Sequence, residues 1–481
     1  MNSKDFLYIF LMFVFLGISF IPDKALVAGT FFIFFLLLIT LWIVFKLRPQ
    51  DKKLFYLILL VFIIRFAVVL FAHYSDLPMF KGGGDFVLYD QQAHQIANLM
   101  HQSFSFENFN PNYYIEKGVA IGIYYPVVVG FIYRFVFPDM FVGQMFNAWI
   151  VTISAILIYF LVLELGGSKN SAFWVGFLST LYPSYLYYGT LLLKEAIFIM
   201  LCMFGLLLSL KLLRNFKWSI FCILYLTLIG LVNLRFYVAY ALMIGFVLSW
   251  FLFGKMDIKK RIIWGILIIM FFGFTPQISG YGYFGMGTLK QYANPETISF
   301  FRQEAYNPII QNQQFPHSVQ QEFEKTPDGA HPGTRSSIAI DLNFNNPFKF
   351  LWTISESFFY VILGPLPWQI KSFKQAFVLG EMIPWYFLLY FVISGSIKSV
   401  KKDKVVFCLI FFSILVFGVL ALFLSNFGIV TRIRMPAFLS LFCFAVLGFD
   451  DSYLQRQIIK FKNFIIKKSY KISLNAKKIS N

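Results

Sequence analysis

The sequence predicts an all-α polytopic membrane protein with about 12 transmembrane helices and additional interfacial helices. Three observations lead to this prediction. The chain of 481 residues is 59% hydrophobic and only 13% charged, and its mean hydropathy is +0.70. Many apolar runs of about 20 residues are long enough to cross roughly 30 Å of hydrocarbon as helices. The alternation of apolar and polar residues that a membrane β-barrel requires is missing from the sequence.

Twelve crossings are expected from length and composition. In chain order they are 6–22, 25–46, 54–73, 141–165, 172–189, 191–212, 218–234, 236–253, 262–279, 376–397, 405–424 and 429–449. Two more apolar stretches, 119–137 and 348–366, are ambiguous. Each also contains proline, which disturbs the interior of a helix. Tyr125-Pro126 lies early in the first stretch, and Gly364-Pro365-Leu366-Pro367-Trp368 ends the second.

The basic residues decide how these two stretches are placed. Loops that face the cytoplasm carry an excess of Lys and Arg. The basic loops of this chain are 46–53, 211–217, 254–261 and 398–404. All four share one side of the membrane only if neither ambiguous stretch crosses. Both stretches are therefore predicted to be interfacial or re-entrant helices.

This topology divides the chain into three parts. Residues 1–53 are expected to form an additional N-terminal helix pair, 54–449 the transmembrane core, and 450–481 a basic cytoplasmic tail against anionic lipid. Two extracytoplasmic loops, 74–140 and 280–375, interrupt the core, and loops of this length are usually functional. The basic loops and tail explain the formal net charge of +18, so no nucleic-acid partner is predicted. The four cysteines lie in apolar runs and are predicted to be packing residues.

An acidic segment outside the membrane is the strongest chemical signal. Lys81-Gly82-Gly83-Gly84-Asp85 follows a hydrophobic span, and glycine lets a backbone turn sharply or approach a ligand closely. Asp85 stands at the predicted N-cap of an amphipathic helix, so it is expected to cap the helix, to be a catalytic carboxylate, or both. Three preceding glycines favour the catalytic interpretation. The apolar face of the helix is predicted to consist of Phe86, Tyr89, Ala93, Ile96, Ala97 and Met100.

Two further pairs of polar residues lie near the expected outer surface. Asp90 and His94 occupy the polar face of the same helix. Asp90 is expected to assist Asp85, to help hold a divalent cation such as Mg²⁺ or Mn²⁺, or simply to face solvent. Lys194 and Glu195 open the span 191–212, where charges are costly without partners. They either pair with residues on neighbouring helices or border a cavity shared with Asp85.

Three arginines near the outer ends of spans run against the topology bias. Arg235 lies between the spans 218–234 and 236–253, while Arg432 and Arg434 lie in the last span. A guanidinium is planar, permanently charged and suited to phosphate oxygens. These arginines are therefore candidates to hold the phosphate of a lipid-linked donor. The alternative is that they pair with Glu195 or Glu381.

These residues resemble a known family. The chain is similar to the GT-C superfamily of glycosyltransferases that use polyprenyl-phosphate sugars, most of all to the bacterial branch related to protein O-mannosyltransferases and the lipid A aminoarabinose transferase. The resemblance covers about 54–449. It rests on Gly84-Asp85 with Tyr89 after an early span, Tyr125-Pro126 in an interfacial helix, Pro183 late in a span, Lys194-Glu195 opening the next, Pro365-Leu366-Pro367-Trp368, and Arg432-Ile433-Arg434-Met435-Pro436 in the last span.

The resemblance implies a GT-C-like fold and a glycosyltransferase. Such an enzyme moves a sugar from a polyprenyl-phosphate donor to a glycan, lipid or protein acceptor at the extracytoplasmic face of the bacterial cytoplasmic membrane. The catalytic candidates are Asp85, which would act on the acceptor, Asp90 and Glu195. The candidates for binding the donor phosphate are Lys194, Arg235, Arg432 and Arg434. The family often has two adjacent acids, and its metal requirement differs between branches, so no metal ligand is assigned.

Two other functions are consistent with the sequence. A transporter or flippase of a lipid-linked glycan should show inverted repeats and polar groups near mid-membrane. No convincing repeat is found, and Arg65, the one clear mid-span charge, marks either a conduit or a buried pair. An O-antigen polymerase or ligase would keep the chemistry but use a pyrophosphate-linked donor. The loop 280–347 is expected to be a lid or an acceptor-binding loop.

Overall fold

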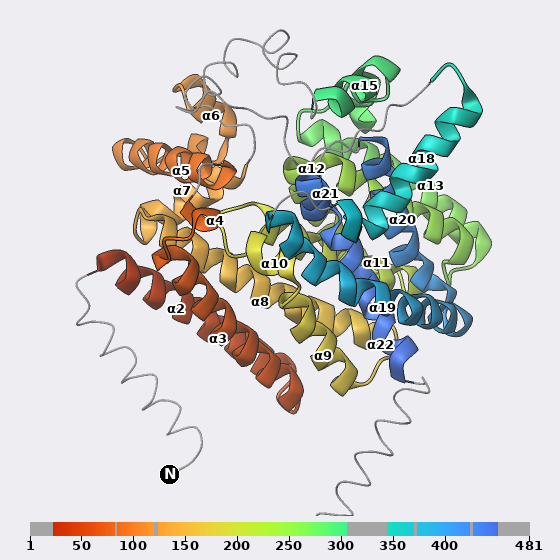
Figure 1. Ribbon diagram of the computed structural model, residues 1–481, viewed down its shortest axis with the longest axis horizontal. Helices are drawn as coiled ribbons and strands as arrows, with labels where there is room; N and C mark the ends of the chain where they lie inside the picture. Colours follow the sequence, from red (N-terminus) through yellow and green to blue (C-terminus); the bar gives the residue numbers. More distant parts are fainter. Residues whose placement is uncertain are drawn as a thin grey trace, which may run out of the picture.

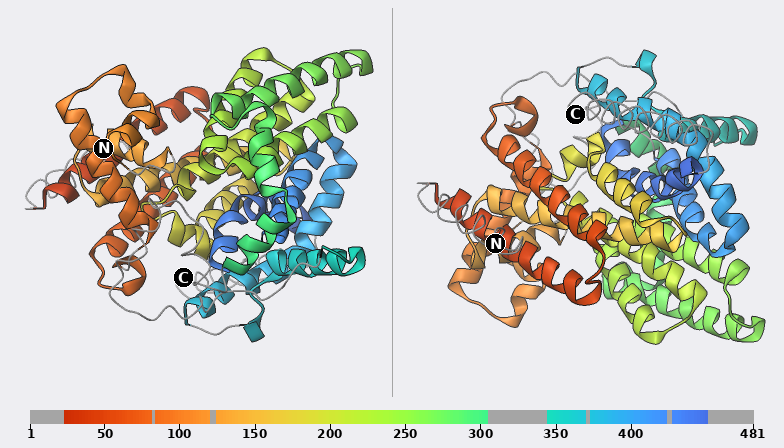
Figure 2. Two further views of the ribbon diagram at one scale, coloured as in Figure 1. Left: turned by 90° about the horizontal axis from the view of Figure 1, so that it is seen from above. Right: turned by 90° about the horizontal axis from the view of Figure 1, so that it is seen from below.

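The structure is a computed structural model that describes residues 23–81, 84–119, 124–304, 344–369, 373–423 and 427–450. Every regular element among these residues is a helix, and eight of the helices are long and apolar enough to cross a membrane. This agrees with the predicted all-α polytopic membrane protein. Figures 1 and 2 show the elements from α2 to α7 on one side of the molecule, and α13 and α18 to α20 on the other.

The first half of the described chain holds ten α-helices and one 3-10 helix. They are α2 (Lys24–Leu47), α3 (Lys52–Tyr74), α4 (Pro78–Lys81), α5 (Asp85–Gln102), η1 (Phe106–Phe109), α6 (Pro111–Glu116), α7 (Tyr125–Phe135), α8 (Met140–Glu164), α9 (Lys169–Thr180), α10 (Pro183–Tyr188) and α11 (Glu195–Arg214). The second half holds α12 (Trp218–Phe253), α13 (Ile258–Ile278), η2 (Tyr283–Gly285), α14 (Met286–Tyr292), α15 (Pro295–Glu304), α18 (Pro347–Leu363), η3 (Pro367–Gln369), α19 (Phe373–Lys402), η4 (Lys404–Val406), α20 (Phe407–Leu422), α21 (Phe427–Ile433) and α22 (Met435–Asp450).

Most expected crossings match a helix within a few residues, and three differ in an informative way. The expected crossing 172–189 is divided into α9 and α10, because Pro183 lacks a backbone N–H and begins a new helix. The crossing expected from residue 191 begins only at Glu195, which leaves Lys194 in a short loop before α11. The last crossing is divided into α21 and α22 at Arg434. The expected crossing 6–22 and the tail from 451 lie outside the described residues.

The helix α12 contains a sharp reversal at Arg235. Arg235 has φ −154° and ψ 85°, the only non-helical backbone conformation within this element of 36 residues. The ring of Phe216 lies 6.0 Å from Phe221 and 5.6 Å from Trp250. A straight helix would hold Phe221 and Trp250 about 43 Å apart. The two halves therefore fold back on each other, as the two predicted crossings 218–234 and 236–253 require, and Arg235 stands at the apex.

All four basic loops gather at one end of the helical bundle. Asp403 accepts a hydrogen bond from Arg214 Nε at 2.9 Å and pairs with Lys255 at 3.2 Å, which joins three of the loops. Arg214 also pairs with Glu164 at the end of α8. The fourth loop lies at the same end, because Arg48 stands over the ring of Phe160 on the last turns of α8. This shared end is what the charge pattern predicted.

The elements between α3 and α8 form a small unit around α5 and α7. The buried face of α5 contains all six apolar residues that periodicity predicted. Its contact with α7 is close, since a Cβ on Gly130 would lie 2.4 Å from Ile96 Cγ2. The helix α7 has 11 residues and rises about 16 Å, too little to cross a bilayer alone. Neither α7 nor α18 is among the eight helices that are long and apolar enough to span.

Candidate functional site

Four of the predicted site residues meet at the end of the bundle opposite to the basic loops. Arg432 donates from Nη2 to Asp85 Oδ2 at 3.0 Å and from Nε to Glu195 Oε1 at 3.2 Å. Arg235 donates from Nη2 to the same oxygen of Glu195 at 2.7 Å. We call Asp85, Glu195, Arg235 and Arg432 the charge cluster. It joins α5, α11, α12 and α21, so only the tertiary structure assembles it.

Glu195 is the buried centre of the charge cluster. Its side chain is 1% exposed, whereas Asp85 is 51% exposed. Glu195 is the first residue of α11, where the positive end of the helix dipole favours a carboxylate. A buried charge is costly unless it is paired, and two guanidinium groups pair with this one. Glu195 therefore fixes the positions of the two arginines and presents almost no surface to a substrate.

The loop before α11 is held by a buried asparagine that the sequence analysis did not single out. Asn147 Nδ2 donates to the carbonyl oxygens of Leu191 at 2.7 Å and Leu193 at 2.9 Å. Its side-chain oxygen accepts a hydrogen bond from Tyr125 Oη at 3.1 Å. Asn147 is fully buried inside the apolar helix α8. A polar residue within a spanning run was the available signal, because such residues are usually retained for a contact.

Lys194 adds a third cation beside the charge cluster. Burial and the neighbouring charge of Arg235 lower the pKa of Lys194 to about 8, while the Glu195 carboxylate opposes this shift. Lys194 therefore changes charge in a pH range where the arginines remain fully protonated.

Aromatic side chains hold the two guanidinium groups in place. Arg432 stands over the ring of Tyr188, 5.3 Å from its centroid, and Arg235 stands over Phe198 at 5.7 Å. Arg235 Nη1 also donates to Tyr237 Oη at 2.9 Å. Contacts of this kind favour a cation in a defined orientation. The charge cluster is therefore preorganised on its buried side and open at Asp85.

The structure corrects the predicted capping role of Asp85. The N-cap of α5 is Gly84, with φ 155° and ψ −173°, and Asp85 is the first residue of the helix. No side chain caps this helix end by a hydrogen bond, so the prediction that Asp85 is the N-cap is wrong. The backbone conformation of Gly84 is one that essentially only glycine adopts, which explains this glycine. Gly82 and Gly83 lie outside the described residues.

Asp90 belongs to a different group of side chains. It accepts a hydrogen bond from Tyr133 Oη and lies 3.8 Å from His94 Nε2. Burial raises the pKa of Asp90, while the hydrogen bond from Tyr133 and the nearby His94 oppose that shift. Adjacent helical residues differ by about 100° in direction, so positions five apart face different sides of α5. Asp85 and Asp90 therefore do not form a carboxylate pair.

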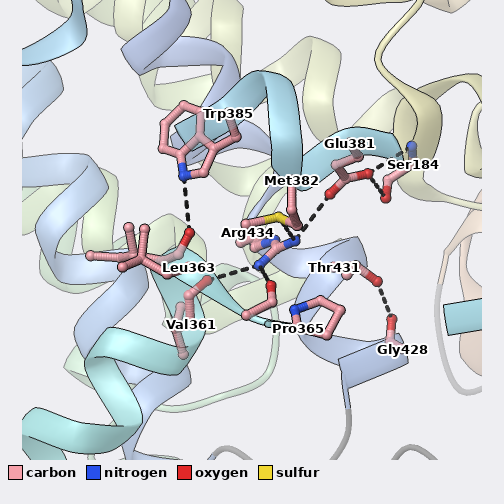
Figure 3. A network of polar contacts seen from close by, with 12 residues as sticks. Ser184, Val361, Leu363, Pro365, Glu381, Met382, Trp385, Gly428, Thr431 and Arg434 are labelled. Carbon is pink, nitrogen blue, oxygen red and sulfur yellow. Dashed lines mark hydrogen bonds and ion pairs between the residues drawn. The ribbon is translucent and has the colours of Figure 1, made fainter. Parts of the chain in front are cut away.

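Arg434 lies in a fully buried network, shown in Figure 3. Its guanidinium donates to Glu381 Oε1 at 3.0 Å and to the carbonyl oxygens of Val361 at 3.0 Å and Gly364 at 2.6 Å. Glu381 in turn accepts hydrogen bonds from the backbone and hydroxyl of Ser184. Arg434 and Glu381 both have 0% exposed side chains. The network ties the C-terminal end of α18 to α10, α19 and α22.

Arg65 satisfies backbone groups at the break between α9 and α10. It donates to the carbonyl oxygens of Thr180, Tyr185 and Leu186, and its side chain is buried in α3. The divided helix leaves carbonyl groups without intrahelical partners, and buried carbonyls of this kind need donors. The mid-span charge thus has a structural role, which weakens its interpretation as part of a conduit.

The described residues provide no set of ligands for the divalent cation considered in the sequence analysis. Among the residues that the structure describes, no three His, Cys, Asp or Glu side chains lie close enough together to hold a metal ion. Asp90, the proposed oxygen donor, and Asp85 have separate partners, and Asp85 pairs with Arg432 and interacts with Lys194. These residues do not fit a divalent cation. Most of the expected lid, residues 305–343, lies outside the described residues.

No protein-family model matches the chain, and no curated protein matches it significantly. The function of the charge cluster therefore has to be inferred from its residues and their geometry.

Proposed function

We propose that the protein is a membrane glycosyltransferase that moves a sugar from a polyprenyl-phosphate donor to an acceptor hydroxyl. The charge cluster is the observation that carries this proposal. Two guanidinium groups, fixed by a buried glutamate, lie next to a half-exposed carboxylate at one end of a helical bundle. Cations suit a phosphate leaving group, and the carboxylate suits an acceptor that must lose a proton.

The residues divide into three roles in the proposed reaction. Asp85 takes the proton from the acceptor hydroxyl while the acceptor oxygen bonds to the anomeric carbon of the sugar. The bond from that carbon to the phosphate oxygen breaks, and the polyprenyl phosphate leaves with the electron pair. Arg235 and Arg432, with Lys194 nearby, stabilise the negative charge that develops on the leaving phosphate. Glu195 is a positioning residue that holds both guanidinium groups.

The proposed location of the reaction is the extracytoplasmic face of a bacterial cytoplasmic membrane. The helix α11 runs from the charge cluster at Glu195 to the basic end at Arg214, and its 20 residues rise about 30 Å, the thickness of the hydrocarbon layer. If the basic loops face the cytoplasm, the charge cluster lies at the outer surface. We propose twelve crossings, counting both halves of α12 and including 6–22.

Labelling of single cysteines tests this orientation. In a cysteine-free background, an impermeant thiol reagent added outside should modify Lys290→Cys, which lies beyond α13, and should miss Lys255→Cys at the basic end. Both positions are exposed in the structure. Labelling of Lys255→Cys alone, or of both variants to the same extent in sealed cells, would contradict the proposed topology.

Transfer from defined donors tests the activity. The purified protein, reconstituted in proteoliposomes, should transfer radiolabelled sugar from at least one member of a panel of polyprenyl-phosphate sugars. Lys255→Gln is the matched control, because it removes a cation from the opposite end of the bundle. It should keep the wild-type rate, whereas Arg432→Gln should lose most of it. Transfer from pyrophosphate-linked donors alone would favour an O-antigen polymerase or ligase, and movement of intact donor without transfer would favour a flippase.

A further inference from the structure

Arg432 is shared by two carboxylates that differ sharply in exposure. Glu195 is 1% exposed and Asp85 is 51% exposed, and each accepts a hydrogen bond from a different nitrogen of the same guanidinium. We propose that Asp85 is an internal occupant of an anion site on Arg432, and that an anionic phosphate ligand displaces it. This inference rests on the proposed function for the identity of the ligand, and adds an order to it: donor binding first, release of the carboxylate second.

The two bonds of Arg432 are expected to respond differently to a competing anion. Exposed ion pairs contribute little to stability, because solvent screens them and ordering the side chains costs entropy. A phosphate oxygen can therefore replace Asp85 at small cost and can form two parallel hydrogen bonds to the guanidinium. Breaking the buried bond to Glu195 would leave a desolvated carboxylate less well paired. The ligand should thus exchange with Asp85 and leave Glu195 in place.

The elements around Arg432 permit this exchange without a large movement. Glu195 and the ring of Tyr188 fix the guanidinium from the buried side. Asp85 comes from another element, α5, whose buried face packs independently against α7. A rotation of the Asp85 side chain is sufficient to break its bond to Arg432. Once displaced, the carboxylate oxygen is free to accept the proton of an acceptor hydroxyl.

This arrangement links the binding of the donor phosphate to the availability of the Asp85 carboxylate. Without a donor, Arg432 donates a hydrogen bond to Asp85 Oδ2, so this oxygen cannot accept the proton of the acceptor hydroxyl. With a donor bound, the same arginine holds the phosphate. A variant that lacks the Asp85 charge should therefore bind a phosphate more tightly while it transfers sugar more slowly. A carboxylate that only supported the local structure would not produce this opposite pair of effects.

Binding of a polyprenyl phosphate without sugar tests the inference. The full-length protein in nanodiscs is titrated with this lipid, and inorganic phosphate is used as a second probe. Asp85→Asn should lower the dissociation constant by about two- to fivefold, the range expected when one exposed ion pair no longer competes. Asp90→Asn is the matched control, since it removes the same charge from the same helix but contacts Tyr133 instead of Arg432. Its dissociation constant should stay at the wild-type value.

A double variant localises the effect. In the background of Arg432→Gln, binding should be weak, and Asp85→Asn should no longer tighten it. Unchanged or weaker binding by Asp85→Asn would overturn the inference, as would equal tightening by Asp90→Asn, which would indicate long-range charge alone. Binding of neither probe by any variant would overturn the anion site. Tight binding with the predicted competition but no sugar transfer would contradict the proposed function and leave this inference intact.

Discussion

Arg432 and Arg434 stand in the same short motif, yet the structure gives them different environments. Arg432 is 19% exposed and joins Asp85 to Glu195 near the surface. Arg434 is fully buried and binds Glu381 and two backbone carbonyls. The difference arises because the chain breaks between α21 and α22 at Arg434. Of these two arginines, only Arg432 has an exposed partner, so residue type alone does not identify a candidate binding group.

The largest expected effect is on stability, at Arg434. Arg434→Met removes one partner of a buried ion pair and leaves Glu381 uncompensated. Changes of this kind cost about 3–5 kcal/mol, so the variant should unfold at a much lower temperature in detergent. Adding Glu381→Gln should recover part of the loss, because an amide can still accept from Ser184 and no charge remains. Wild-type thermal stability of Arg434→Met together with lost transfer would assign Arg434 to the ligand and remove the contrast with Arg432.

The second effect is on transfer, at Arg432. Arg432→Gln should lower kcat/KM by about 10²–10³, the usual consequence of removing one donor to a developing negative charge. Its unfolding temperature should fall less than that of Arg434→Met, because Glu195 retains Arg235 as a partner. The assay measures the initial rate of transfer at limiting donor. The amount of folded protein is measured for Arg432→Gln and for Arg434→Met. A full rate for Arg432→Gln would show that the charge cluster does not hold the phosphate.

A smaller effect is expected at Tyr237. Tyr237→Phe removes the oxygen that accepts from Arg235 and leaves the ring in place. A hydrogen bond to a charged group is worth about 1.5–3 kcal/mol, so donor affinity should fall through a less well oriented arginine. The dissociation constant of the donor lipid reports this directly. Tyr188→Phe is the control and should have a weaker effect, because Tyr188 contacts Arg432 through the ring that this variant keeps.

The smallest effect concerns pH. Lys194 has a lowered pKa of about 8, so it is charged below that pH and neutral above it. Donor affinity should therefore fall as pH rises through about 8, by about two- to fivefold if the cation acts as one partly exposed ion pair. A bound phosphate favours the charged form, so the fall should begin at higher pH in the complex. Lys194→Met should bind more weakly at pH 7 and lose this pH dependence. If the donor affinity of Lys194→Met still falls as pH rises, another titratable group causes the pH dependence.

Local patterns in the sequence predicted the elements of this molecule well. The apolar face of α5 follows from helical spacing, which depends only on neighbouring residues. The reversal at Arg235 follows from run lengths, since a largely apolar segment of 36 residues exceeds one crossing. The common end of the basic loops follows from their charge. The break before Pro183 and the late start of α11 were missed, because Arg65 and Asn147 satisfy buried carbonyl groups that the breaks leave unpaired, and these contacts come from other helices.

The candidate site could be predicted only as a set of residues. Arginines that contradict the topology bias pointed to Arg235 and Arg432, and the cost of a charge at the start of a span pointed to Glu195. These three residues do meet. The same signal marked Arg434, because one sequence cannot tell which of two nearby arginines turns inward. The pairing of Asp85 with Arg432 joins residues far apart in the chain and has no local signature. The N-cap prediction failed because the helix begins one residue earlier in the structure, at Asp85, than the apolar spacing indicated.

The most direct test of the proposed function is the transfer rate of Asp85→Asn at saturating donor. The variant keeps the size of the side chain, and Asp85 caps no helix, so the unfolding temperature should equal that of the wild type. Loss of a general base typically lowers the rate by about 10²–10⁴-fold, and we predict a loss in this range. A folded Asp85→Asn that transfers sugar at the wild-type rate would contradict the account and would leave the charge cluster without a catalytic carboxylate.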